Sequence, residues 1–179
     1  DWPEIEDRAY PDVVGDAMRI PFMAQSIDTV LAAELMEHLP SPQNFLAEAA
    51  RVLRDGGIII LSVPFMEPLH EEPRDYYRFT PYSLRMLLGQ NGFSIQQLWN
   101  KGGWWSVVLG SFLNQVIYNW ASSLDESGQR RYGILTLLIL PICAILQWLG
   151  YQLDRVFHSS KYTLGYTVVA IRESRPSPK

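Results

Sequence analysis

The chain has 179 residues, with 15 Lys and Arg against 19 Asp and Glu, and a formal net charge of −4. This length is typical of one domain, and the acidic balance argues against a general nucleic-acid-binding protein, which would carry a basic patch. The single cysteine, Cys143, lies in an apolar run and can form no disulfide within the chain. Such cysteine usage fits a reducing compartment and predicts a cytoplasmic location.

Short apolar runs that end in small or acidic residues alternate with helical stretches along the first hundred residues. Ser41-Pro42 and Thr80-Pro81 are typical helix starts, with an N-cap residue followed by proline. The run 58–63 is continuously apolar, as expected for a strand covered by helices on both faces, and Gly56-Gly57 is expected to form the turn before it. Expected strands cover 13–14, 27–33, 58–63, 93–98 and 164–171, and expected helices cover 41–53 and 80–88.

This order of elements predicts an α/β fold with a parallel sheet, whose ligands bind at the carboxyl ends of the strands. The predicted core covers 1–101 and 160–172, and an apolar helical insertion covers 102–158. The polar, proline-containing tail 173–179 is expected to be disordered.

The insertion holds two uncharged stretches, 102–124 and 132–153. The second is long enough to cross a bilayer, which takes about 20 apolar residues. Both flanking strands belong to one sheet, so the chain must return to the same side. Two crossings or a shallow helical hairpin satisfy this condition, and the kink expected at Pro141 suits a hairpin.

Aromatic residues of the insertion are of the types that are favoured at membrane interfaces. They are expected along one apolar face: Trp104, Trp105, Tyr118, Trp120 and Trp148. We therefore expect contact with a membrane, at the inner face of the cell membrane. The alternative is that two helices pack on the soluble domain or form a homodimer interface.

Four motifs occur in a fixed order: G-D-A-x-x-I-P-F at 15–22, S-I-D-T-V at 26–30, E-H-L at 37–39 and R-V-L-R-D-G-G at 51–57. This ordered set resembles the class I S-adenosylmethionine-dependent methyltransferases, type 11-like. The resemblance covers roughly residues 1–100 and the last strand. It implies a Rossmann-like sheet with an antiparallel last strand, and S-adenosylmethionine as cofactor.

The family's opening strand and glycine-rich turn do not precede Asp1. The sheet is therefore expected to be incomplete at its N-terminal side, and the chain to be a fragment of a longer enzyme that is inactive alone. The alternative is a catalytically inactive, methyltransferase-like, membrane-associated interaction domain that has lost the cofactor.

The resemblance assigns several residues to the cofactor. Asp16 would accept a hydrogen bond from the adenine amino group, the Ala17 backbone N–H would meet a ring nitrogen, and Asp1 would hold the ribose hydroxyls. Ala33 and Glu34 would lie beside the sugar and the methionine. Met18 and Ile20 are candidates for packing on adenine, with core packing as the alternative. For Asp16 the alternative is a helix cap or a solvated carboxylate.

Glu34, Glu37 and His38 have the spacing i, i+3 and i+4, which places three potential ligands on one face of a helical turn. Two carboxylates and an imidazole suit a divalent ion such as Mg²⁺, Mn²⁺ or Zn²⁺. The same motif binds metal in ubiquinone-biosynthesis O-methyltransferases and in small-RNA 2′-O-methyltransferases, the latter with a further histidine, for which His70 is available. Alternatively, Glu37 and His38 orient the helix.

The loop 64–82 reads H-x-x-P-x-D-Y-x-R-F-T-P from His70 onward, which resembles methyltransferases linked to cell-surface glycan or lipid biosynthesis. His70 is the first candidate for a catalytic base, with His38 as the second, because the pKa of histidine lies near neutrality. Asp75, Tyr76, Tyr77 and Arg78 are expected to shape the acceptor pocket. Alternatively, Arg78 pairs with Asp75 or Glu72 in a structural lid.

These features together predict methyl transfer to a small or lipid-linked acceptor, at an oxygen, near a membrane. No nucleic-acid partner is expected. A nicotinamide-dependent dehydrogenase is disfavoured because neither the G-D-A-x-x-I-P-F motif nor an antiparallel last strand is a feature of that class.

Overall fold

A computed structural model describes residues 12–121, 134–157 and 161–174. Two compact units divide the chain: one lies within Asp1–Val63, Glu71–Leu98 and Thr167–Lys179, and the other comprises Pro64–His70 and Trp99–Tyr166. The strands are β1 (Ile27–Ala33), β2 (Leu53–Pro64), β3 (Phe93–Lys101) and β4 (Gly165–Arg172). The helices are the 3-10 helix η1 (Met36–His38), α1 (Pro42–Val52), α2 (Pro81–Gln90), α3 (Trp104–Ala121) and α4 (Ile134–Val156).

The strands form one four-stranded sheet in the order β1-β2-β4-β3. β1 and β2 are parallel, with Ala33 opposite Ser62. Leu164 N–H donates to the Lys101 carbonyl and Glu173 N–H donates to the Gly92 carbonyl, one at each end of the β3–β4 pair. These bonds make β4 antiparallel to β3. The predicted mixture of parallel pairing and an antiparallel last strand is therefore confirmed.

The glycine pair of β2 forms a bulge inside the strand and not the predicted turn before it. Ile27 lies opposite Leu53, whereas Thr29 lies opposite Ile58, so β2 has extra residues between these two pairs. Gly56 has a φ of 78°, in the region that favours glycine. A Cβ atom on Gly57 would lie 2.8 Å from the Arg54 carbonyl oxygen. The bulge therefore requires glycine at both positions, and the strand starts directly after α1.

The strand predicted at 13–14 is not formed. Val13 and Val14 are exposed, and the segment continues into a tight turn in which Arg19 N–H donates to the Asp16 carbonyl (2.9 Å). Two apolar residues are too few to hold a strand in a sheet by themselves. The turn instead provides hydrogen bonds for the backbone within the segment.

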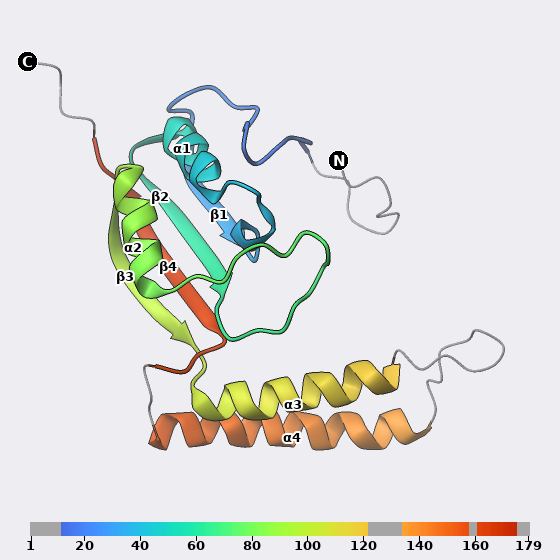
Figure 1. The fold of residues 1–179 in the computed structure, drawn as a ribbon. Coiled ribbons are helices and arrows are strands. Elements are labelled where there is room, and N and C mark those ends of the chain that lie inside the picture. Colours follow the sequence, from blue (N-terminus) through green and yellow to red (C-terminus); the bar gives the residue numbers. More distant parts are fainter. Residues whose placement is uncertain (1–11, 122–133, 158–160, 175–179) are drawn as a thin grey trace, which may run out of the picture. The chain divides into compact units, whose positions relative to one another are not determined.

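The helix starts at Ser41-Pro42 and Thr80-Pro81 are confirmed. The Ser83 N–H donates to Thr80 Oγ1 (3.1 Å), whereas Ser41 makes no side-chain cap bond. The two helices lie side by side on one face of the sheet (Figure 1). Their buried residues include Phe45, Leu46, Ala49, Leu84 and Leu88.

The side chains of β2 alternate in burial. Ile59, Leu61 and Val63 are fully buried, whereas Ile58 and Ile60 on the opposite face are partly exposed. The continuous apolar run had predicted helices on both faces. In the described part of the first unit, the α-helices lie on one face only.

The insertion forms the two predicted helices, α3 and α4, which pack against each other. Their seam includes Val107, Leu113 and Cys143, all buried. Gly150 permits the closest approach, because a Cβ atom there would lie 3.3 Å from the Trp105 carbonyl oxygen. Tyr118 and Trp120, predicted on the apolar face, belong to the part of α3 whose side chains lie outside the described ones.

Asp154, near the end of α4, caps the start of α3. Its carboxylate accepts hydrogen bonds from the N–H groups of Gly103 (2.8 Å), Trp105 (2.9 Å) and Ser106 (3.0 Å). Burial of the carboxylate opposes its charge, but these bonds and one from the Ser106 side chain outweigh that effect and lower the pKa of Asp154. The two helices are therefore antiparallel, with a tertiary N-cap that joins their ends.

Within the described residues, no helix combines the length and the apolar character that crossing a bilayer requires.

We expect Asp154→Ala to destabilise the α3–α4 hairpin by about 1–2 kcal/mol, because three N–H groups at the start of α3 lose their acceptor. The measurement is urea unfolding followed by tryptophan fluorescence, since Trp104 and Trp105 adjoin the cap. The lowered pKa means that the stabilisation is complete above the ordinary pKa of aspartate, about 4, and is lost as the pH falls further.

The matched control is Asp28→Ala, which removes an exposed carboxylate paired with Arg54 and should cost less than about 1 kcal/mol. Equal unfolding curves for Asp154→Ala and the wild type at neutral pH would contradict the role of this cap.

Candidate functional site

A turn at Gly15-Asp16-Ala17 borders a cavity of about 450 Å³ in the first unit. Asp16 Oδ1 accepts from Met18 N–H (2.8 Å), which fixes the carboxylate and directs the chain through the turn. A Cβ atom on Gly15 would lie 2.7 Å from the Pro21 ring, so the turn requires glycine there. The residues of the G-D-A-x-x-I-P motif therefore all belong to this one turn.

The predicted cofactor residues divide into two groups in the structure. Asp16, Ala17 and Ile20 line the cavity together with Asp12, Val13, Gly15, Pro21 and Phe22. Met18 is absent from the described lining and serves the turn through its N–H. Ala33 and Glu34 lie at the end of β1 and are not part of this lining either, and Asp1 lies outside the described residues.

Two residues of α1 that the sequence analysis missed hold this segment in place. Arg51 donates to the carbonyls of Ile20 (2.7 Å) and Phe22 (2.8 Å), and Ile20 N–H donates to Glu48 Oε2 (3.0 Å). Arg51 Nε donates to Glu48 Oε1 (2.8 Å), and this hydrogen bond lowers the pKa of Glu48 and raises that of Arg51. The i, i+3 spacing of Glu48 and Arg51 was the available signal, but it is also that of an ordinary surface pair.

The carboxyl ends of β1 and β2 meet at Glu34. Its N–H donates to the Ser62 carbonyl (2.9 Å), and its carboxylate accepts from the Ser62 hydroxyl. The φ of Glu34 is 47°, so the chain turns sharply here into η1. Glu34 is therefore positioned by the strand ends, and it does not lie on one helical turn with Glu37 and His38 as predicted.

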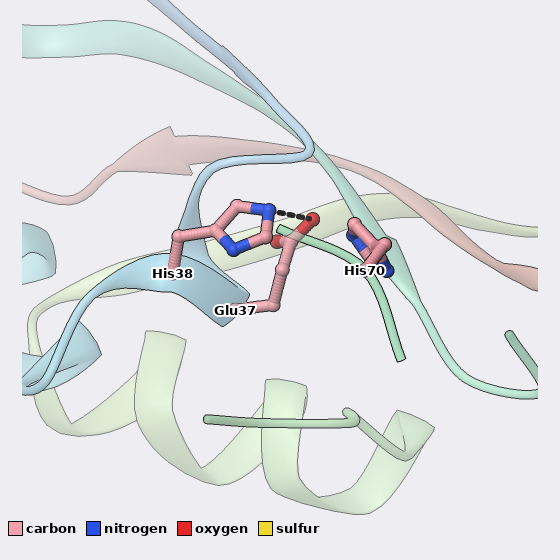
Figure 2. A group of neighbouring side chains, drawn as sticks. All are labelled: Glu37, His38 and His70. Atoms are coloured by element: carbon pink, nitrogen blue, oxygen red, sulfur yellow. Dashed lines mark ion pairs between the residues drawn. The ribbon is translucent and has the colours of Figure 1, made fainter. Parts of the chain in front are cut away.

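Glu37 and His38 lie in η1, where Nε2 of His38 is 3.7 Å from Glu37 Oε1 (Figure 2). His38 Nδ1 lies 2.8 Å from the Arg74 carbonyl oxygen and must donate to it, because a carbonyl only accepts. Such an anchor on Nδ1 is also what metal-binding histidines use. The metal site at Glu34, Glu37 and His38 stays a prediction, with Glu34 now held by Ser62.

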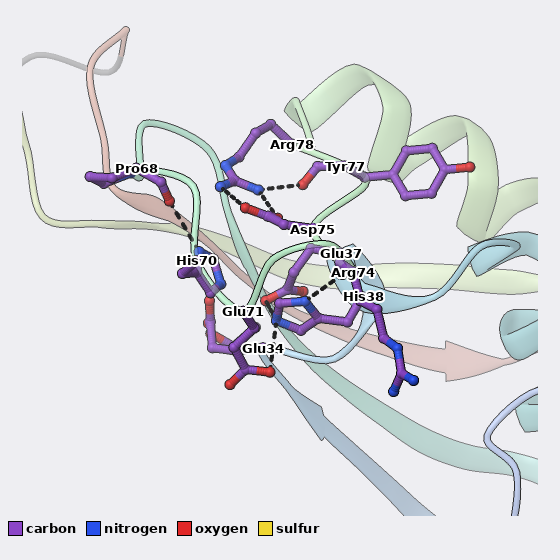
Figure 3. A network of polar contacts seen from close by, with 11 residues as sticks. Glu34, Glu37, His38, Pro68, His70, Glu71, Arg74, Asp75, Tyr77 and Arg78 are labelled. Carbon is purple, nitrogen blue, oxygen red and sulfur yellow. Dashed lines mark hydrogen bonds and ion pairs between the residues drawn. The ribbon is translucent and has the colours of Figure 1, made fainter. Parts of the chain in front are cut away.

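η1 also fixes the segment that follows Glu71. Tyr76 N–H donates to the Glu37 carbonyl (2.9 Å), and the Tyr77 hydroxyl donates to the Pro40 carbonyl (3.1 Å). The bond between His38 and Arg74 is the third contact (Figure 3), so η1 and the residues directly after it hold this segment at three points. Glu37 and His38 thus hold the segment at Arg74 and Tyr76, and the alternative in which they orient the helix stays a prediction.

Asp75 and Arg78 form a two-point ion pair in which Arg78 Nη1 and Nη2 lie 2.5 and 2.7 Å from the two carboxylate oxygens (Figure 3). The Asp75 side chain is almost fully buried. Arg78 also donates to the Tyr77 carbonyl (2.9 Å). The pairing of Arg78 with Asp75 is therefore present, and the lid role stays a prediction, while Tyr76 and Tyr77 remain partly exposed beside this pair.

His70 belongs to the second unit, and its Nδ1 lies 3.1 Å from the Pro68 carbonyl oxygen. The carbonyl accepts from this nitrogen, so in the neutral ring the proton resides on Nδ1 and the basic lone pair on Nε2. This is the tautomer that a general base acting through Nε2 requires.

Part of the chain is similar to known proteins. A model described as a methyltransferase domain matches residues 4–61, which include the turn, β1, η1, α1 and most of β2. An uncharacterized chloroplastic methyltransferase of Arabidopsis thaliana is 34% identical over 74 residues, covering 36% of this chain and 21% of the relative. The 27-O-demethylrifamycin SV methyltransferase of Amycolatopsis mediterranei is 38% identical over 58 residues, covering 32% and 21%.

The chain is thus similar to class I S-adenosylmethionine-dependent methyltransferases over residues 4–61. It spans about a fifth of the length of these two curated relatives. Its fold is Rossmann-like: the crystal structure of the [4+2]-cyclase SpnF aligns with a TM-score of 0.56 at 19% identity, over 91% of this chain and 56% of the cyclase. This likeness shows the fold alone.

We expect Arg51→Met to loosen the segment 12–22, because the Ile20 and Phe22 carbonyls lose their donor. Amide hydrogen exchange in this segment should become at least several-fold faster, while the amides of α2 keep their rates. The matched control is Arg54→Met, three residues later, where the exposed arginine bonds only to Asp28 in the described contacts. Equal exchange in the two variants would contradict the clamp.

Proposed function

We propose that this chain takes part in S-adenosylmethionine-dependent methyl transfer to an oxygen of a small or lipid-linked acceptor. The observation that carries this proposal is the Gly15-Asp16-Ala17 turn, which borders a cavity and lies within the matched methyltransferase segment. The transfer to oxygen is supported by the relative whose name gives 27-O-demethylrifamycin SV as its acceptor.

The turn offers the groups that adenine needs. Asp16 Oδ1 is engaged by Met18 N–H, which leaves Oδ2 to accept from an exocyclic amino group. The Ala17 N–H is the donor proposed for a ring nitrogen, and Ile20 and Phe22 supply apolar lining for a flat ring. Arg51 and Glu48 keep these residues in place from α1, so the site is organised before ligand binds.

Bound S-adenosylmethionine would supply a methyl group that its sulfonium already activates. The chain's task is then to orient the acceptor and to remove one proton from its hydroxyl. We assign this proton to Nε2 of His70, because the Pro68 carbonyl holds the Nδ1 proton. Loss of that proton to His70 leaves the electron pair of the O–H bond on the acceptor oxygen, which makes this oxygen the nucleophile.

We expect Asp16→Ala and His70→Asn to separate binding from reaction in the full natural protein. Asp16→Ala should weaken the binding of S-adenosylhomocysteine by about 1–3 kcal/mol, since one hydrogen bond to adenine is lost. His70→Asn should leave that affinity unchanged and slow methyl transfer about 100-fold or more. Calorimetry gives the first quantity and transfer of labelled methyl groups gives the second.

Asp28→Ala serves as the control for both measurements, because it removes an exposed carboxylate on β1. Unchanged affinity in Asp16→Ala would remove Asp16 from the cofactor site. An unchanged rate in His70→Asn would remove His70 as the base.

The hairpin supports a second part of the proposal, that the protein lies on a lipid surface. α4 contributes a narrow buried seam at Cys143, Gly150 and Asp154, and most of the remaining described surface of the helix is exposed and apolar. Large exposed side chains on this surface include Ile142, Ile145, Trp148, Leu149, Tyr151 and Val156. An apolar surface of this extent calls for a partner.

The composition of this surface favours lipid over a second copy of the chain. Tryptophan and tyrosine are the types that occupy membrane interfaces, and Trp148 and Tyr151 are both more than half exposed. Arg155 and Lys161 are exposed at the same end of the hairpin, where they would complement anionic headgroups. A helix lying in the interface plane uses such an arrangement without spanning the bilayer.

We expect the protein to float with anionic phosphatidylglycerol vesicles in a density gradient. The pair Ile145→Ser and Trp148→Ser should reduce this binding more than tenfold, because burial of each such side chain contributes about 1.5–3 kcal/mol. The matched control is Tyr82→Ser, which removes an exposed aromatic side chain on α2. No flotation, together with a dimer that the pair of substitutions dissociates, would instead make the hairpin a homodimer interface.

A further inference from the structure

An aromatic corner, formed by Trp104 and Tyr162, lies at the base of the hairpin in the second unit. The centroids of the two rings are 4.6 Å apart and their planes are inclined by 65°, so one ring meets the other edge-on. Both residues are exposed, at 40% for Trp104 and 41% for Tyr162. Two large rings at a steep angle, each open to solvent, provide two adjoining walls for a ligand.

The backbone that carries both rings is fixed by hydrogen bonds. Asp154 accepts from the N–H groups on either side of Trp104, at 2.8 and 2.9 Å. Thr163, directly after Tyr162, is fully buried and donates through its hydroxyl to the Lys101 carbonyl (2.9 Å). The two walls are therefore held together before a ligand arrives, which lowers the entropic cost of binding.

The aromatic corner favours a cation of one type. The faces of aromatic rings attract cations, because the π electrons give each face a negative potential. Tryptophan is the strongest side chain in this respect, and tyrosine also contributes. A quaternary ammonium group suits such walls better than a primary one, since it donates no hydrogen bonds to water and its methyl groups pack against the rings.

Lys161 adds a second condition on the ligand. It directly precedes Tyr162 and is exposed. Its ammonium group would repel a ligand that carries only a positive charge, but it would attract a phosphate. A zwitterion in which a short carbon linker joins a phosphate to a quaternary nitrogen meets both conditions. Phosphocholine is such a group.

We propose that Trp104, Tyr162 and Lys161 bind the phosphocholine headgroup of a membrane lipid. Its nitrogen has no lone pair, so this group is a docking ligand and not a methyl acceptor. Val156 and Phe157, exposed by 73% and 61%, lie at the same end of the hairpin, where lipid tails would meet them. The lipid as the source of the headgroup rests on the lipid surface proposed above, whereas the binding of phosphocholine itself does not.

Saturation-transfer NMR of the full natural protein with phosphocholine tests the headgroup site. We expect Trp104→Leu and Tyr162→Leu each to reduce the signal about fivefold or more, because one aromatic wall is lost. Tyr162→Phe should keep the signal, since the ring face remains. Lys161→Met should reduce the phosphocholine signal, and phosphoethanolamine should bind more weakly than phosphocholine. The matched control is Tyr82→Leu, which removes an exposed tyrosine of α2 in the first unit and should keep the signal.

A flotation experiment identifies the source of the headgroup. Two kinds of vesicle contain the same fraction of phosphatidylglycerol, and the remainder is phosphatidylcholine in one and phosphatidylethanolamine in the other. We expect binding to be about fivefold or more tighter to the vesicles with phosphatidylcholine. Tyr162→Leu should abolish this difference and keep the binding that both vesicles share.

The headgroup site is overturned if phosphocholine gives no signal, if both leucine variants of the aromatic corner keep the signal, or if phosphoethanolamine binds equally well. Loss of the signal in Tyr162→Phe, with circular dichroism that shows a folded protein, would also overturn it, because the hydroxyl and not the ring would be the contact. Equal flotation with both vesicles would refute the lipid source and leave the lipid surface of the hairpin intact. Phosphocholine binding without flotation would contradict the lipid surface and assign the site to a soluble phosphocholine compound.

Discussion

The parallel pairing of β1 with β2 is the constraint on which the first unit depends. It places Ala33 opposite Ser62, so that both strands end at the same edge of the sheet. Glu34 extends the ladder by one bond to the Ser62 carbonyl and then turns the chain into η1, which in turn holds the segment at Arg74, Tyr76 and Tyr77. A slip of one residue would exchange the buried and exposed faces of β2 and displace this whole series of contacts.

The elements that the sequence predicted well are those with a local physical cause. Ser41-Pro42 and Thr80-Pro81 mark helix starts through capping and a fixed proline φ, and the run 27–33 became β1 without change. The glycine pair was recognised but misplaced, because only the partner strand shows that Gly56 and Gly57 lie inside β2. The roles of Arg51 and Asp154 depend on contacts with residues roughly 30 and 50 positions away, which no local pattern reports.

The sheet and its helices do not fix the reaction. A cyclase shares this fold over most of the described chain at 19% identity, so the chemistry must come from residues placed on the fold. In this chain the candidate site residues come from two parts of the sequence. The turn around Asp16 lies in the segment that matches the methyltransferase family model, whereas His70 and the Asp75–Arg78 pair lie beyond it. In the function proposed above, cofactor recognition is assigned to the matched segment and acceptor recognition to residues beyond it.

The ends of the insertion are joined independently of its distant parts. Thr163 donates through its hydroxyl to the Lys101 carbonyl (2.9 Å), Leu164 N–H donates to the same carbonyl (3.0 Å), and Asp154 ties the end of α4 to the start of α3. With its ends fixed, lengthening the connection adds only a small entropic cost, because loop closure depends on the logarithm of length. None of these bonds uses the exposed apolar side chains of α4, so that surface is not needed to hold the ends of the insertion together.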